Sequence, residues 1–101
     1  MNNITAADLK TRMEAGEKMN LIDVREPHEN AEFNIGGILL PLGKIQTMQT
    51  EDIDDLKTEE VICYCRSGMR SMQAAMILEQ LGFSNVKNLE GGMMVWREKY
   101  S

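Results

Sequence analysis

One short segment in the second half of the chain combines a thiol with fixed positive charge. It reads Cys65-Arg66-Ser67-Gly68-Met69-Arg70-Ser71. A cysteine that lies beside arginines is stabilised as the thiolate, which is the nucleophilic form of the side chain. The segment therefore predicts a nucleophilic Cys65 that acts without a histidine base.

The residues on either side of this segment predict a strand, a tight loop and a helix. Residues 61–64 are apolar, β-branched or aromatic, as in a buried strand. An apolar helical pattern begins at about Ser71, whose hydroxyl suits an N-cap, and stops at Gly82. A loop that closes onto a helix N-terminus turns several backbone N–H groups inward and forms an anion site. We expect Cys65 to lie at the mouth of that site.

The rest of the chain alternates short apolar runs with helical patterns. Further strands are expected at residues 20–24, 38–40 and 86–89, and further helices at 5–15, 27–32, within 42–60 and after residue 92. This alternation predicts one α/β domain over residues 1–101, with a parallel sheet and helices on both faces. Ligands bind beyond the carboxyl ends of such strands. Cys65 follows one strand there, and Asp23 and Arg25 follow another.

Composition and cysteine count narrow the partners and the setting. The net charge of -5 argues against nucleic acid and anionic membranes as partners. The sequence contains no secretory leader pattern and no apolar run long enough for a membrane span, so we expect a cytoplasmic protein. Cys63 and Cys65 are badly placed to bridge each other, and with the single His28 they do not supply a zinc site. We expect a reduced chain without metal or cofactor.

Three motifs resemble those of one known family. The segment from Cys65 to Ser71 is similar to the active-site loop of the rhodanese-like sulfurtransferases, and Leu-Ile-Asp-Val-Arg-Glu-Pro-His-Glu at 21–29 resembles the family's other signature. Leu-Glu-Gly-Gly at 89–92, followed by Trp96, resembles its closing motif. Where many members have Gly-His-Ile-Pro-Gly-Ala, this chain has Phe-Asn-Ile-Gly-Gly-Ile at 33–38, and we expect the turn there to be kept. The resemblance implies a five-stranded parallel sheet flanked by helices.

The resemblance also implies a chemistry. A small sulfur donor, thiosulfate or a persulfide, would pass its outer sulfur to Cys65, and cyanide, a thiol or a protein acceptor would then take it. The backbone N–H groups from Arg66 to Ser71 would stabilise the anionic sulfur. Arg70 would orient the loop and hold the charge of the donor.

Several side chains allow a plainer interpretation. Asp23 and Arg25 either support the loop or form an ordinary turn at a strand end. Arg66 is either an entrance residue or a solvated charge. We expect Cys63 to pack in the core rather than to resolve a disulfide, and His28 to be solvated rather than a base. Core positions are expected for three further side chains: Met72, Met76 and Trp96.

Other classes of function stay open. A cysteine-based phosphatase or arsenate reductase has a longer loop between its cysteine and arginine, whereas four residues separate Cys65 from Arg70 here. By resemblance to the family, whose shorter loops handle sulfur and whose longer loops resemble those of phosphatases, this length favours sulfur chemistry. A module without enzymatic turnover, which carries a persulfide to a partner or docks onto one, is the third hypothesis.

Overall fold

The computed structural model describes residues 1–100 and contains five strands in one sheet. The strands are β1 (Asn2–Ile4), β2 (Leu21–Asp23), β3 (Ile38–Leu39), β4 (Glu60–Tyr64) and β5 (Asn85–Leu89). Their order is β1-β5-β4-β2-β3, and every neighbouring pair is parallel. The predicted five-stranded parallel sheet is therefore confirmed.

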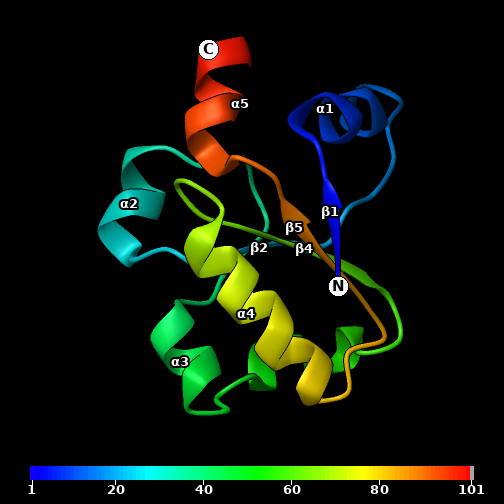
Figure 1. Ribbon diagram of the computed structural model, residues 1–101, viewed down its shortest axis with the longest axis vertical. Helices are drawn as coiled ribbons and strands as arrows, with labels where there is room; N and C mark the ends of the chain where they lie inside the picture. The colour runs from blue at the N-terminus through cyan, green and yellow to red at the C-terminus, as the bar shows by residue number, and fades with distance from the viewer. Residues whose placement is uncertain (101) are drawn as a thin grey trace.

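Helices cover both faces of this sheet (Figure 1). They are α1 (Ala6–Glu14), α2 (Pro27–Glu32), α3 (Leu42–Gln46), the 3-10 helix η1 (Glu51–Leu56), α4 (Met69–Gln80) and α5 (Gly92–Tyr100). On one face Leu9 of α1 and Trp96 of α5 pack together, and on the other Ile45, Ile53 and Leu78 come from α3, η1 and α4. Trp96 is thus a core residue, as expected. Among residues 1–100, no helix is long and apolar enough to cross a bilayer.

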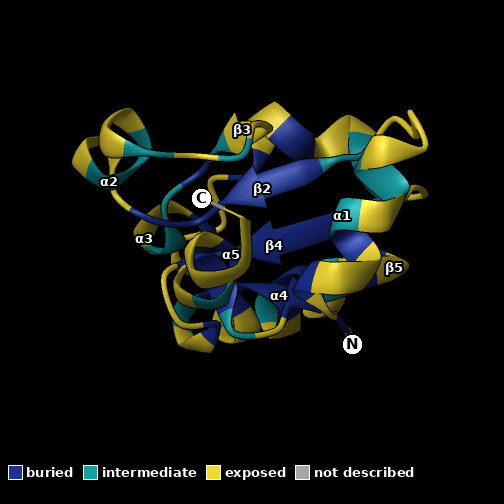
Figure 2. Ribbon diagram, turned by 90° about the horizontal axis from the view of Figure 1, so that it is seen from above, coloured by how far each residue is buried: buried dark blue, intermediate teal, exposed yellow. Residues whose placement is uncertain are grey.

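Parallel strands bring their carboxyl ends to one edge of the sheet. In Figure 2 the arrows of β2 and β4 point the same way, and α2 lies beyond their tips. Both strands are almost completely buried because they lie between two layers of helices. The Val24 N–H donates to the Tyr64 carbonyl at 3.1 Å, which keeps the two strand exits together. Cys65 leaves β4 at this edge.

The turn expected within residues 33–38 is present before β3. A Cβ at Gly37 would lie 2.1 Å from the Leu21 carbonyl oxygen, so the close approach of the turn to β2 needs a glycine. The Tyr64 hydroxyl donates to the Gly36 carbonyl at 2.9 Å. The turn is therefore fixed against both β2 and β4.

The start of α4 differs from the prediction. The helix begins at Met69, and its N-cap position is occupied by Gly68, whose φ of 98° is left-handed. Glycine adopts this conformation without strain, so the chain can turn sharply between Cys65 and the helix. Ser71 consequently lies in the first helical turn, and its hydroxyl is used for contacts inside the site.

The prediction that Met72 and Met76 belong to the core is wrong. Their side chains are 42% and 52% exposed. The face of α4 that meets the sheet carries Ala74, Ala75 and Leu78 instead. Small alanines let the helix lie close to the sheet, so only one stripe of the helix is covered and the methionines face outward.

Candidate active site

The Cys65 sulfur lies inside the turn that joins β4 to α4. Among residues 66–71, all of which the structure describes, Gly68 and Ser71 donate to it. The N–H groups of Gly68 and Ser71 lie 3.1 and 3.3 Å from Sγ, and the Ser71 hydroxyl lies 3.4 Å away. Cys65 is 1% exposed, while Ser67 and Met69 are exposed at the outer rim of the loop. The arrangement places hydrogen-bond donors where negative charge on sulfur would develop.

The N-terminus of α5 holds the loop from behind. The Met93 N–H donates to the Cys65 carbonyl at 2.8 Å, and the Met94 N–H donates to the Arg66 carbonyl at 2.9 Å. A Cβ at Gly92 would lie 2.3 Å from that Cys65 oxygen. Only glycine permits this approach, which explains the glycine at the first position of α5.

Asn88 on β5 reaches the same loop and was missed by the sequence reasoning. Its side-chain amide N–H donates to the Gly68 carbonyl at 3.2 Å, and its Oδ1 accepts from the Ser71 hydroxyl. Asn88 is 2% exposed. The signal available in the sequence was a polar amide directly before Leu89 in the strand expected at 86–89.

Arg70 is bound by a carboxylate on α2. Its guanidinium donates to the two carboxylate oxygens of Glu29 at 2.8 and 2.9 Å. These hydrogen bonds lower the pKa of Glu29 from its ordinary value to about 2. The charge of Arg70 is therefore directed at Glu29 rather than at the open loop. Glu29 lies inside the matched motif at 21–29, yet nothing in the motif indicates Arg70 as its partner.

Asp23 and Arg25 form a buried ion pair next to α2. Arg25 donates to both Asp23 carboxylate oxygens, with Nε and Nη2 each at 2.9 Å. Arg25 also donates to the Phe33 carbonyl at 2.6 Å, and Asn30 donates to Asp23 at 2.9 Å. These contacts hold α2 at Asn30 and at its C-terminal end. Because α2 carries Glu29, the pair supports the loop through α2 and Arg70.

A cavity of about 460 Å³ opens beside the loop. Its lining includes Arg66 from the loop, Phe33 and His28 from the α2 region, and Met94 and Arg97 from α5. The Arg97 guanidinium lies 4.8 Å from the centre of the Phe33 ring. His28 is exposed, and within residues 1–100 the Arg66 side chain makes no ion pair. Arg66 therefore brings a positive charge without an ion pair to a cavity whose wall also carries Arg25, Arg97, Glu29 and Glu32.

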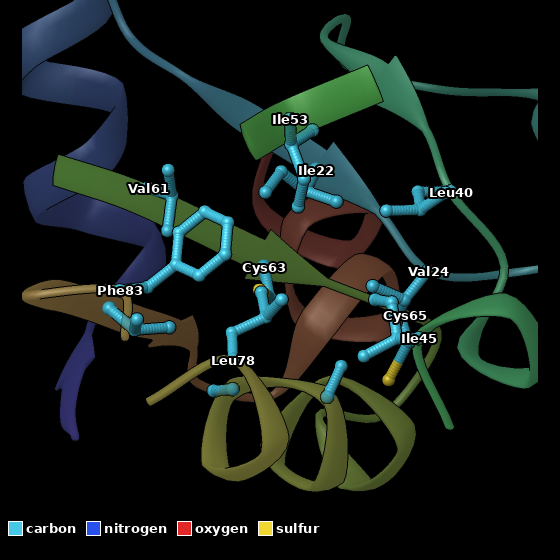
Figure 3. Packing of buried hydrophobic residues seen from close by; sticks show 13 residues of the cluster. Ile22, Val24, Leu40, Ile45, Ile53, Val61, Cys63, Cys65, Leu78 and Phe83 are labelled. Atoms are coloured by element: carbon cyan, nitrogen blue, oxygen red, sulfur yellow. The ribbon is translucent and has the colours of Figure 1, made fainter. Parts of the chain in front are cut away.

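The second thiol differs from the first although it lies two residues earlier. Cys63 is completely buried, and burial, followed by the charge of Cys65, raises its pKa to about 12. Figure 3 shows Cys63 close to Leu78 inside the cluster, with Cys65 near Val24 and Ile45. Both cysteines are free. Cys63 has the environment of a packing residue.

Comparisons with known proteins agree with this geometry. The rhodanese-like domain family matches residues 5–99. YtwF of Bacillus subtilis is 44% identical over 98 residues, covering 95% of this chain and 90% of YtwF. A sulfurtransferase of Allochromatium vinosum is 38% identical over 97 residues, covering 95% and 88% of the two chains. The crystal structure of a rhodanese-like domain protein from Staphylococcus aureus superimposes with a TM-score of 0.80 at 29% identity, covering 95% and 91%.

Proposed function

The chain belongs to the rhodanese-like domain family, and on that basis we propose that it transfers a sulfane sulfur from a small donor, such as thiosulfate, to a thiophilic acceptor. The observation that carries the proposal is the position of the Gly68 and Ser71 N–H groups, 3.1 and 3.3 Å from the Cys65 sulfur. Fixed backbone donors stabilise negative charge without having to reorganise during a reaction. Cys65 is the proposed nucleophile and persulfide carrier.

In the loading step the Cys65 thiolate attacks the outer sulfur of the donor. A sulfur–sulfur bond forms at Cys65, and the sulfur–sulfur bond of thiosulfate breaks with its electron pair leaving on sulfite. The product on the protein is an anionic persulfide. Dividing the transfer through this covalent intermediate splits one displacement into two easier ones.

In the discharge step a nucleophilic acceptor attacks the outer sulfur of the persulfide. Cyanide would leave as thiocyanate, and a thiol would leave as a persulfide. The bond between the two sulfurs breaks, and its electron pair returns to Cys65 as the thiolate. The Gly68 and Ser71 donors stabilise that leaving group.

The charge pattern supports an anionic donor. The whole chain carries a net charge of -5, but Arg66 follows Cys65 directly and faces the cavity without an ion pair in residues 1–100. A local positive charge in an acidic protein attracts a small anion to one place. Arg66 is the proposed entrance residue.

The length of the loop argues against a phosphatase. Four residues separate Cys65 from Arg70, whereas the loops of cysteine-based phosphatases are longer. Turnover of an aryl phosphate that is lost in Cys65→Ser would overturn this argument.

A persulfide carrier that discharges to a partner protein is the second candidate. Exposed apolar side chains on α4 favour it, because Met69, Met72 and Met76 follow the loop at helical spacing and are 69%, 42% and 52% exposed. Large exposed apolar side chains are common where proteins meet. Brisk multiple turnover with cyanide would make this second candidate unnecessary.

The proposal includes a reducing compartment. Cys63 and Cys65 are both free thiols. Catalytic thiols persist where the cell keeps cysteines reduced, as in the cytoplasm. Fractionation of cells that express the chain at its natural level tests this cytoplasmic placement.

Intact mass spectrometry after thiosulfate treatment tests the function. We expect the wild-type protein to gain one sulfur atom and to lose it on addition of cyanide. Cys63→Ser is the matched control, since it removes the neighbouring thiol and should still gain the sulfur. Cys65→Ser should gain none. A folded, reduced wild-type protein that takes up no sulfur would contradict the proposal.

A further inference from the structure

Asn88 contacts the turn from Cys65 to Ser71 at two points. It is 2% exposed and lies on β5 opposite Cys63. Its amide N–H donates to the carbonyl of Gly68, and its Oδ1 accepts from the hydroxyl of Ser71. Gly68 and Ser71 are also the two residues whose N–H groups contact the sulfur. One buried side chain from another strand therefore holds both backbone donors.

The Ser71 hydroxyl has two acceptors but a single hydrogen. Oγ lies within hydrogen-bond distance of Asn88 Oδ1 and 3.4 Å from Cys65 Sγ. A hydroxyl donates one hydrogen and accepts through its lone pairs. When the hydrogen points to Asn88, a lone pair faces the sulfur and suits a neutral S–H. When the sulfur is a thiolate, the hydrogen gains more by turning to it, because hydrogen bonds to charged acceptors are stronger.

We propose that Asn88 is a positioning residue that controls the stability of the Cys65 thiolate through Gly68 and Ser71. It holds the Gly68 and Ser71 N–H groups on the sulfur, and this positioning outweighs its competition with the thiolate for the Ser71 hydrogen. Only the hydroxyl rotates, so no proton passes between Ser71 and Asn88. The expected effect of Asn88 on sulfur transfer rests on the proposed function, because the discharge step of that function re-forms the Cys65 thiolate.

The rate of Cys65 alkylation by iodoacetamide, measured against pH, tests this inference without assuming sulfur transfer. Asn88→Leu keeps the size of the side chain and removes both hydrogen bonds. We expect alkylation at neutral pH to slow about tenfold and its pH midpoint to rise, as expected for the loss of hydrogen bonds to a charged group. Since neither side chain is charged, such a change in midpoint reports hydrogen bonding. Asn85→Leu, on the exposed start of the same strand, is the matched control and should alkylate like wild type.

Combining Asn88→Leu with Ser71→Ala separates the positioning of the sulfur's hydrogen-bond donors from a general loss of stability. Ser71→Ala alone should slow alkylation and cyanide discharge about threefold, because it removes one donor to the thiolate. In the double variant, Ser71→Ala should slow alkylation and discharge by a smaller factor than it does in the wild-type protein, because Asn88 acts partly through Ser71. A folded Asn88→Leu variant that is less stable but alkylates with the wild-type pH midpoint would overturn the proposal.

Two further outcomes keep the inference decidable. If Asn88→Leu does not fold, Ser71→Ala alone decides: unchanged alkylation and discharge would refute the role of the hydroxyl, and a threefold loss would support it. If the wild-type protein takes up no sulfur from thiosulfate, the proposed function fails. The alkylation comparison then still tests whether Asn88 supports the thiolate.

Discussion

The two ends of strand β4 direct hydrogen-bond donors at an acidic side chain by different means. At its start, Glu60 accepts from Arg12 at 2.6 and 3.1 Å and from Lys87 at 2.6 Å. The hydrogen bonds from Arg12 contribute most to lowering the pKa of Glu60 to about 2. At the other end, the N–H groups of Gly68 and Ser71 and the Ser71 hydroxyl are directed at the Cys65 sulfur. One end uses long, partly exposed side chains, and the other uses the main chain.

This difference separates stability from reactivity. Arginine and lysine side chains are flexible and screened by solvent, so the Glu60 cluster can add to the free energy of unfolding without fixing atoms to within a few tenths of an ångström. Backbone donors have directions that the fold determines, and a reaction that develops charge on sulfur needs that precision. Substitutions at the two ends should therefore change different measurements.

The largest contrast is expected between the two thiols near the reactive end. A thiol with a pKa of about 12, such as Cys63, is ionised at roughly one part in ten thousand at pH 8. We expect iodoacetamide to modify Cys65 at least about a thousandfold faster than Cys63 in the native protein. In denaturant it should modify both thiols. Both cysteines lie in one tryptic peptide, so fragment ions must assign the label. Cys63→Ser should alkylate like wild type, and comparable labelling of the two native thiols would remove the distinction.

The next largest effect concerns the glycine behind the loop. In Gly92→Ala the new Cβ would lie 2.3 Å from the Cys65 carbonyl oxygen and 2.6 Å from that of Arg66, so the loop must shift. We expect sulfur loading to fall more than about tenfold and the free energy of unfolding by about 2 kcal/mol or more. Gly82→Ala is the control, since Gly82 also has a positive φ but no atom within 4 Å of its Cβ. It should lower stability alone. Wild-type loading by folded Gly92→Ala would show that the loop tolerates displacement.

The sequence indicates the elements of this molecule better than it indicates their contacts. Apolar runs bounded by glycine and proline are enough to predict β2 to β5 and the helices between them. β1 has no such signal, because Asn2 and Asn3 are exposed at the sheet edge and only Ile4 is buried. The resemblance implies five strands, but no strand is predicted at residues 2–4. Edge strands carry little hydrophobic pattern, so periodicity alone cannot locate them.

The site shows the same limit. Cys65 and its loop are recognisable because their residues are consecutive. Asn88 meets Ser71 from 17 residues away, and Glu29 meets Arg70 from 41 residues away. Which face of a strand or helix meets the loop depends on packing, and no local pattern records it. The exposed Met72 illustrates the same point, since an apolar residue type does not determine whether its helix face is covered.

An effect smaller than that of Gly92→Ala is expected at the start of β4, where Glu60 lies. Glu60→Gln removes the charge that Arg12 and Lys87 share, and we expect about 1 kcal/mol of lost stability at pH 7 with unchanged sulfur loading. The pKa of Glu60 is lowered from 4.5 to about 2, so its contribution is complete above pH 4.5 and disappears as the pH falls toward 2. Urea unfolding at pH 7 and pH 3 measures the difference. Glu59 is the exposed neighbour of Glu60, and Glu59→Gln should change neither stability nor sulfur loading. If Glu60→Gln lost equal stability at both pH values, the charge of Glu60 would be excluded as the cause.

The smallest effect tests whether Arg70 belongs with the stabilising end or the reactive end. Glu29→Gln weakens the pairing and leaves the guanidinium positive, so thiosulfate loading should become about twofold to threefold faster if Arg70 can turn to the donor. Arg70→Ala should slow loading by a similar factor. Glu32→Gln removes the same charge from the cavity wall without touching Arg70 and serves as the control. If Glu29→Gln instead slows loading as much as Arg70→Ala does, Arg70 is a tether between α4 and α2, and the charge that attracts the donor comes from the cavity arginines rather than from Arg70.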